Sequence, residues 1–307
     1  MTTVLRRAAH WHRPLMLFVS AMALLAVVSA VGVLADPRIL TGVPIWLKPL
    51  KFSVSFVLYG TTLAWMLSLL PRRSRTAERA GTVIVAMSVV EMVVIVGQVL
   101  RGTTSHYNET TPMNTALWQT MGAAIMVLFV AHVVIGVVVL RQPIADRTGR
   151  YAVGLGLGLT LLGMLAAVPM VAGAETGIEG VAGAHSVGVP DGGPGLPLVG
   201  WSTTGGDLRI GHFVGLHALQ ALPILAILLT RWGTRLDERT RVRLLVVAGA
   251  AYGALTVLVT WQALRGQPLL RPDALTLTVA ASLVVATAAG VGVVVARRRR
   301  PELVLAA

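Results

Sequence analysis

Long apolar runs, separated by short polar segments, recur along the whole chain. Eight of them are long enough to cross about 30 Å of hydrocarbon as α-helices, which takes roughly 20 residues. They cover residues 14–34, 52–70, 81–100, 116–140, 151–171, 210–229, 244–263 and 274–295. Because only helices and closed barrels satisfy their backbone polar groups in lipid, the pattern predicts an all-α, polytopic integral membrane bundle of about eight transmembrane helices. No segment is left for a soluble domain, so residues 1–307 are expected to form a single membrane domain.

The composition supports this fold class. Hydrophobic residues make up 55% of the chain and charged residues 13%, about half the charged share of a soluble domain. The first apolar run, 14–34, is long for a signal-peptide core and has no evident cleavage site, so it is interpreted as a spanning helix. Because the chain has no cysteine, disulfides and thiolate metal sites are excluded.

The positive charges predict the orientation of the bundle. If the N-terminus lies inside, 19 of the 26 lysines and arginines fall in inner segments. This bias predicts a cell-membrane protein with both termini in the cytoplasm. The net charge of +13 is thereby explained by topology, so the expected partner is the lipid bilayer and not a nucleic acid. The sequence leaves the oligomeric state open.

Polar residues follow one face of the second run and the segment that leads into it. Lys48, Lys51, Ser55, Tyr59 and Thr62 are spaced by 3, 4, 4 and 3 residues, which places them on one side of a helix facing the bundle interior. Lys48 and Lys51 are the only lysines in a chain that otherwise uses arginine. A lysine offers a compact charge, so these two are candidates for binding an anion or a carbonyl group, or for pairing with a buried acid. The alternative is that they anchor the helix at the interface by snorkelling.

The third run carries Glu91 about 13 Å from its outer end. An acidic residue at that depth is a functional candidate; the alternative is a structural hydrogen bond or ion pair between helices. Polar residues also crowd the following loop and the start of the fourth run. They are Gln98, Arg101, His106, Asn108 and Gln119.

The first half of the sixth run is the most polar intramembrane stretch. Together with the residues that lead into it, it contains Asp207, Arg209, His212, His217, Gln220 and Pro223. We expect Asp207 to cap the helix and Pro223 to kink it. His217 and Gln220 share a face at a depth close to that of Glu91, whereas His212 and His217 are five residues apart and cannot ligate one metal from this helix alone.

Two further features each allow two interpretations. The outer connection 172–209 has 11 glycines in 38 residues, so it is either a mobile linker or a functional lid. His132 lies deep in the fourth run, where a lone histidine is more often a packed, hydrogen-bonded residue than a ligand.

Together these residues predict an outward-facing polar pocket that takes a small-molecule ligand from the outer face. Its expected lining residues are Lys48, Lys51, Glu91, Gln98, Arg101, His106, Asn108, Gln119, Asp207, Arg209, His212, His217 and Gln220. The sequence is compatible with four functions. Because some of them are enzymatic and others are not, it does not decide whether the protein is an enzyme. The first is a small-molecule or proton-coupled carrier. The second is a membrane redox protein that binds haem or a quinone, with His106, His132, His212 and His217 as candidate haem ligands. The third is an outward-facing enzyme acting on a lipid-linked substrate, and the fourth is a non-catalytic assembly or sensing protein.

Overall fold

The computed structural model describes residues 11–142, 144, 146–172, 179–233 and 236–297. Its helices are α2 (Arg13–Ala35), α3 (Leu47–Ser68), α4 (Arg75–Leu100), α5 (Pro112–Arg141), α6 (Arg147–Leu165), α7 (Arg209–Leu216), α8 (Ala218–Trp232), α9 (Glu238–Leu264) and α10 (Ala274–Ala296). A 3-10 turn, η1 (Val168–Met170), follows α6. Two short antiparallel pairs join β1 (Ile39–Leu40) to β2 (Val43–Pro44) and β3 (Ser186–Val187) to β4 (Gly206–Asp207).

The predicted helical membrane bundle is confirmed. Among the described residues, seven helices are long and apolar enough to cross a membrane individually, and α7 with α8, bent by 42°, completes an eighth candidate span. Several helices begin earlier than the apolar runs predict, among them α3 at Leu47 and α4 at Arg75. For α4 the reason is local, because the Ser74 side chain caps the helix by accepting a hydrogen bond from the Ala77 amide.

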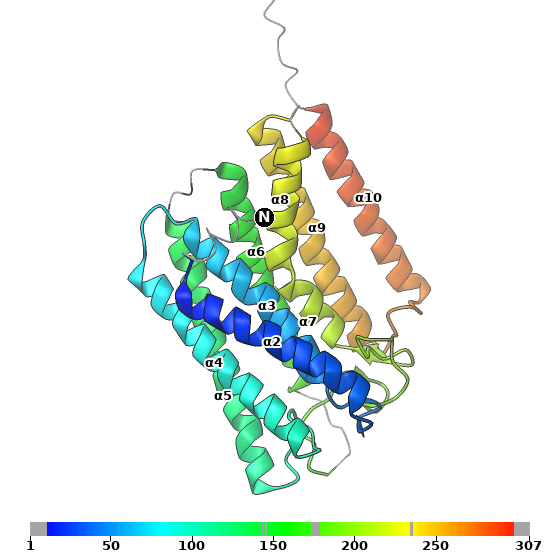
Figure 1. Cartoon of the computed structure of the whole chain (residues 1–307). Coiled ribbons are helices and arrows are strands. Elements are labelled where there is room, and N and C mark those ends of the chain that lie inside the picture. Colours follow the sequence, from blue (N-terminus) through cyan, green and yellow to red (C-terminus); the bar gives the residue numbers. More distant parts are fainter. Residues whose placement is uncertain (1–10, 143, 145, 173–178, 234–235, 298–307) are drawn as a thin grey trace, which may run out of the picture.

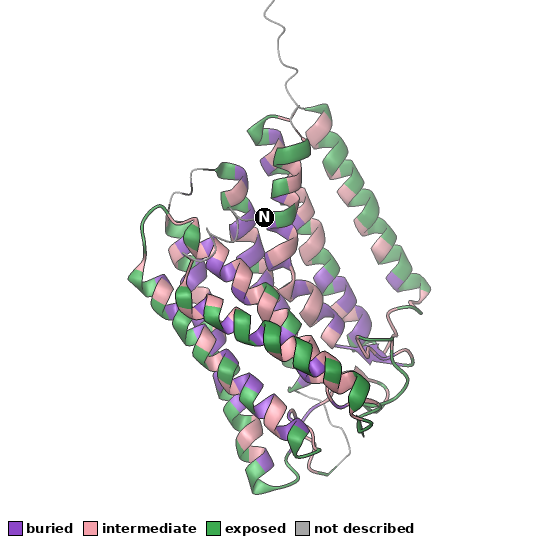
Figure 2. Ribbon diagram, viewed as in Figure 1, coloured by how far each residue is buried: buried purple, intermediate pink, exposed green. Residues whose placement is uncertain are grey.

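The helices form two groups (Figure 1). Helices α2 to α5 pack together, as do α6 to α10, and the groups meet where α5 contacts α6 and α3 contacts α8. An apolar cluster joins the groups through side chains that include Leu15, Leu63, Ile135, Leu157 and Leu219. The outermost helix, α10, packs mainly on α9, and Thr276 is its only buried residue (Figure 2).

One end of the bundle gathers the longer connections, and we call it the long-loop end. The chain there includes 36–46, 101–111, 179–208 and 265–273, which contact one another. The Arg38 guanidinium donates to the Val99 carbonyl over 3.2 Å, and Asn108 forms a β-bridge with Val181. The opposite end, which holds the start of α2 and the end of α10, is called the terminal end (Figure 1). The described part of the 172–209 connection is therefore folded against the bundle.

The sixth span breaks at His217, between α7 and α8. Pro223 lies inside α8, six residues beyond the break, so the kink expected at Pro223 does not coincide with the break. Carbonyls released near the break accept bonds from other helices. Tyr252 of α9 donates to the Val214 carbonyl over 2.6 Å, and Thr160 of α6 donates to the Leu216 carbonyl over 3.3 Å.

A close approach of two glycines fixes α7 against α6. A Cβ atom placed on Gly163 would overlap the backbone of Gly215 and Leu216, and one on Gly215 would overlap Gly163. The absence of both side chains therefore lets the two backbones come together at the level of the break, where small residues commonly mediate helix packing in membranes.

Candidate functional site

The polar face of α3 points toward other elements of the bundle, as its spacing predicts. At the long-loop end, the Lys51 ammonium donates to the Val199 carbonyl over 2.9 Å. Further along the helix, the Tyr59 hydroxyl lies 2.9 Å from Nδ1 of His132 on α5. Thr62 accepts a hydrogen bond of 3.1 Å from Gln220 on α8. This face of α3 therefore lies along the junction between the two helix groups.

Lys48 lies on the same face, and its ammonium has no hydrogen bond or ion pair with a described residue. It is half-buried and lies within electrostatic range of Lys51 and Arg209, which repel it, and of Glu91 and Asp191, which attract it. A half-buried cation with free donors and other cations nearby is a ready binding group for an anion.

Glu91 lies on α4 and is 1% exposed. Its Oε1 atom is buried without a hydrogen-bond partner among the described residues, and Lys48 is the charged group that acts on it. Burying a carboxylate oxygen without a partner costs free energy. This arrangement is unusual for a purely structural residue.

His106 lies in an aromatic surround at the long-loop end. Its ring is 5.8 Å from that of Phe52, 6.0 Å from that of Tyr107 and 5.6 Å from that of Trp118, measured between centroids. Burial, followed by the charges of Lys48 and of nearby histidines, holds the pKa of His106 well below its usual range. The ring is therefore neutral at physiological pH.

A buried ion pair holds the 179–208 segment in place at the long-loop end, beside Lys51 and His106. Asp207, which is fully buried, lies 2.5 Å from Nη2 of Arg209 and also accepts a bond from the Ser202 amide over 2.8 Å. Arg209 additionally donates to the Gly200 carbonyl over 2.6 Å. Asp207 ends β4 and stands one residue before the N-cap position, Leu208, but its Oδ1 accepts the amide of Arg209, the first residue of α7.

His185 and Asp191 form a second pair in the same segment, and the sequence analysis did not single them out. The Asp191 carboxylate lies 2.8 Å from Nδ1 of His185 and accepts the amides of His185 and Ser186. Burial alone would raise the pKa of Asp191, but these hydrogen bonds outweigh it and the pKa falls. The His185 ring packs 5.1 Å from Tyr107, which places this pair against the His106 surround.

Two histidines of the broken span have one ring nitrogen engaged. Nδ1 of His212 lies 2.8 Å from the Gly163 carbonyl, and Nδ1 of His217 lies 3.3 Å from Oε1 of Gln220. Because the oxygen in each pair is an acceptor, we assign the hydrogen to Nδ1 in both rings. Nε2 then carries a lone pair in each, and neither Nε2 contacts a polar atom of the described chain.

His132 is fully buried on α5, and both of its ring nitrogens are occupied. Its Nδ1 faces the Tyr59 hydroxyl, and its Nε2 lies 3.4 Å from the Leu157 carbonyl of α6. The interpretation of His132 as a packed, hydrogen-bonded residue is confirmed, and in this arrangement it has no nitrogen free for a haem iron.

Four of the expected pocket residues are engaged in contacts of the α4–α5 connection or are exposed. Arg101 donates to Gln98 over 2.6 Å and to Asn114 over 3.0 Å, and Asn108 bonds within its own loop. These contacts fasten the α4–α5 connection. Gln119 is exposed on α5. Asp207 is also set aside, because it neutralises Arg209. The candidate site is therefore defined here as Lys48, Lys51, Glu91, His106, Arg209, His212, His217 and Gln220.

The described residues contain no group of three or more histidine, aspartate or glutamate side chains that could hold a metal ion. The cluster instead combines cations at one level, a buried carboxyl group and histidine side chains. Comparison of the chain with protein-family models, curated proteins and solved structures gave no match.

Proposed function

We propose that the protein is a membrane carrier for a small anionic or zwitterionic molecule, which enters at the long-loop end. The observation that carries this proposal is the half-buried Lys48 ammonium, which has free donors and lies near Lys51 and Arg209. Asp207 neutralises Arg209, and the Val199 carbonyl engages Lys51. Lys48 is therefore the cation left to bind a ligand.

The depth of the polar contacts favours transport over a shallow binding site. On α3 they extend from Lys48 to Thr62, which corresponds to about 21 Å along the helix. Gln220 and His217 continue the set at the level of Thr62. The junction between the two helix groups thus offers hydrogen-bonding groups through much of the roughly 30 Å that a carrier must cross.

Glu91 supplies a mechanism for coupling to protons. An anion bound at Lys48 would compete with Glu91 for the ammonium charge, and this competition favours proton uptake by the carboxyl group. Ligand and proton would then move together. The arginine distribution favours placing the long-loop end outside the cell, so the proposed direction of entry is from the outer face.

A ligand screen tests the binding step. Purified protein is heated with phosphate, sulfate, short mono- and dicarboxylates and amino acids, and the unfolding temperature is compared with that of Lys48→Met. At least one compound should stabilise the wild type but not the variant. Arg271→Gln is the matched control, because Arg271 is an exposed cation at the same end. If every compound acts equally on the wild type and Lys48→Met, the anion site is disproved.

Uptake into proteoliposomes tests the transport step. The stabilising compound, radiolabelled, should accumulate faster under an inward proton gradient in the wild type. Glu91→Gln should bind the compound and lose this dependence on the gradient. Binding without uptake would refute the carrier and leave a receptor.

A second candidate, haem or quinone binding, is favoured by one specific observation. Nε2 of His212 and of His217 is free, while Nδ1 donates to an oxygen acceptor. This is the arrangement that metal-ligating histidines usually show. An absorption spectrum of the purified protein, before and after dithionite, tests haem: a Soret band that shifts on reduction supports it, and a colourless protein from haem-supplied cells rules it out.

A further inference from the structure

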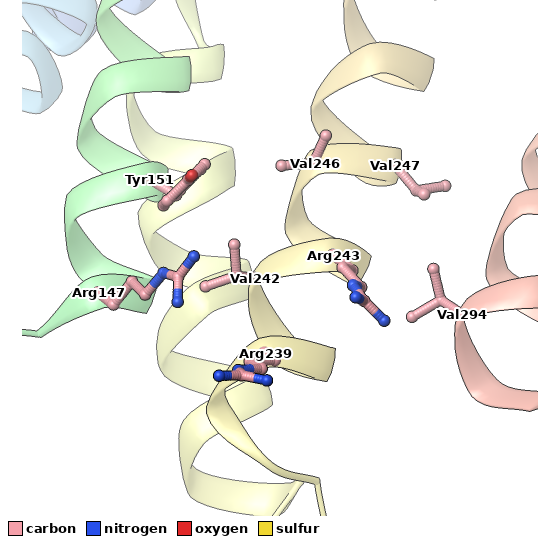
Figure 3. A pocket seen from close by; sticks show the side chains of 8 residues that line it. All are labelled: Arg147, Tyr151, Arg239, Val242, Arg243, Val246, Val247 and Val294. Atoms are coloured by element: carbon pink, nitrogen blue, oxygen red, sulfur yellow. The ribbon is translucent and has the colours of Figure 1, made fainter. Parts of the chain in front are cut away.

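A cavity of about 550 Å³ lies between α6, α9 and α10, far from the candidate site. Its lining residues are Arg147, Tyr151, Arg239, Val242, Arg243, Val246, Val247 and Val294. In Figure 3, the three arginines gather toward one end of the view, and Tyr151 with Val246 and Val247 lies toward the other. The cavity thus has a cationic end and an apolar end.

The cationic end lies at the terminal end of the bundle. Arg147 is the first residue of α6, Arg239 the second of α9, and Val294 belongs to the last turn of α10. Helix ends of membrane proteins lie at the level of the lipid headgroups. From Arg239 to Val247, the cavity follows α9 for about 12 Å toward the hydrocarbon region.

The three arginine side chains have hydrogen-bond donors that a ligand can use. None of them forms an ion pair with any residue in the described part of the chain. Two acidic side chains lie nearby. Asp237 accepts from the Thr240 amide and attracts Arg239 and Arg243 without forming an ion pair with either, and Glu238 accepts from the Arg147 amide. Arg147 also lies over the Tyr151 ring, 6.0 Å from its centroid. The guanidinium groups are therefore available to an anion, and guanidinium matches phosphate geometry well.

We propose that this cavity binds an anionic phospholipid. The phosphate of the headgroup contacts Arg147, Arg239 and Arg243, and an acyl chain follows the valines between α9 and α10. Basic pockets between transmembrane helices are suited to anionic headgroups. The apolar floor selects a lipid over a free phosphate, because a soluble ion would leave the valine surface unused. The sparse packing of α10, with Thr276 as its only buried residue, leaves room for a lipid beside it.

The test measures lipid affinity by native mass spectrometry of the detergent-purified full chain. Dioctanoyl phosphatidylglycerol is the anionic probe, and dioctanoyl phosphatidylcholine and glycerol 1-phosphate are the comparison ligands. Phosphatidylglycerol should bind tightest, since it alone combines a net negative charge with acyl chains. The double variant Arg239→Gln/Arg243→Gln should bind it about 25-fold more weakly, because each arginine near an anionic lipid contributes about fivefold.

Two further double variants separate charge from folding. Arg72→Gln/Arg75→Gln removes two exposed arginines elsewhere at the terminal end and should leave the affinity unchanged. Arg239→Lys/Arg243→Lys keeps the charge and should stay within a few-fold of the wild type. Equal binding of the two lipids, or wild-type binding by the Gln variant, would overturn the proposal. Equal binding of glycerol 1-phosphate would also overturn it, by assigning the cavity to a soluble phosphate.

Discussion

The buried pair of Asp207 and Arg209 should decide whether the 179–208 segment stays closed over the candidate site. The Asp207 carboxylate accepts four hydrogen bonds, from the Ser202 amide and from the amide, Nε and Nη2 of Arg209. In Asp207→Asn the side chain keeps its size but loses its charge and one acceptor oxygen. In either orientation its new NH2 group faces the guanidinium together with one backbone amide, that of Arg209 or that of Ser202, and all of these are donors.

The magnitude follows from burial. Removing one partner of a buried ion pair costs roughly 3–5 kcal/mol. Asp207 is fully buried, but the Arg209 side chain is 22% exposed, so water compensates part of the loss and we expect about 3 kcal/mol, the lower limit. Because each 1.4 kcal/mol is a factor of ten, the segment should open about 100-fold more often.

Hydrogen exchange read by mass spectrometry measures this opening. The peptide covering residues 199–208 contains the Ser202 amide, which donates directly to Asp207, and its exchange should accelerate by about that factor in Asp207→Asn. Arg209→Gln should act similarly. The double variant should cost about 2 kcal/mol less than the sum of the two single changes, since both remove the same interaction.

Asp273→Asn is the matched control at the same end of the bundle. Asp273 pairs with Arg265 at 2.6 Å, but both side chains are more exposed. Asparagine also preserves the cap that Asp273 gives to α10. Its effect on exchange should be clearly smaller. If Asp207→Asn leaves the exchange of 199–208 unchanged, the pair does not hold this segment closed and the reasoning is refuted.

Three further predictions follow from packing and titration. Gly163→Ala should destabilise the protein by about 1–3 kcal/mol, because the new Cβ atom would meet the backbone of Leu216. Gly158→Ala on the same helix should be neutral or stabilising, because a Cβ atom there would have no atom within 4 Å. Thermal unfolding in detergent compares the two variants. The pKa of half-buried His106 lies below its ordinary value of 6.5, so the unfolded state binds more protons. The stability that this residue contributes above pH 6.5 is lost as the pH falls, at up to about 1.4 kcal/mol per unit. Unfolding temperatures from pH 7.5 to 5.5 should show this slope, and His106→Phe should reduce it, leaving the part that His185 contributes. Glu91→Gln should keep the wild-type unfolding temperature within a few degrees, because Oε1 of Glu91 has no described hydrogen-bond partner to lose; a large drop would show that the carboxyl group is structural.

The sequence was sufficient to predict the helices because a span requires only a local apolar run of a certain length. Their ends were less predictable. The second run was expected to start at residue 52, but α3 already starts at Leu47 and includes both lysines. Lysine is compatible with a helix outside the hydrocarbon, so hydropathy does not mark that boundary.

The break at His217 could not be inferred from the neighbouring residues. Pro223 is the local signal for a kink, yet α8 contains it without a break. The bend lies where Thr160 and Tyr252 accommodate the released carbonyls and where Gly163 admits the α7 backbone. These partners are on α6 and α9, so the position of the bend depends on tertiary contacts.

The candidate site was partly predictable for a similar reason. Lys48 and Glu91 stand out because charged groups in or near lipid are costly. His185 and Asp191 lie in a glycine-rich connection, where polar residues carry no such signal, and only the folded segment brings them to Tyr107. Arg101 illustrates the reverse case, since its polarity suggested a ligand-binding role while its contacts with Gln98 and Asn114 fasten a loop.

The most direct test of the proposed outward-facing site uses the fact that Lys48 and Lys51 are the only lysines in the chain. An amine-reactive, membrane-impermeant reagent is added to intact cells, and modified peptides are identified by mass spectrometry. The account predicts modification of Lys48, which has a free ammonium, in the wild type and in Lys51→Arg, and none at residue 48 in Lys48→Arg. Modification of Lys48 only after the membrane is permeabilised, or no modification at all, would contradict the account.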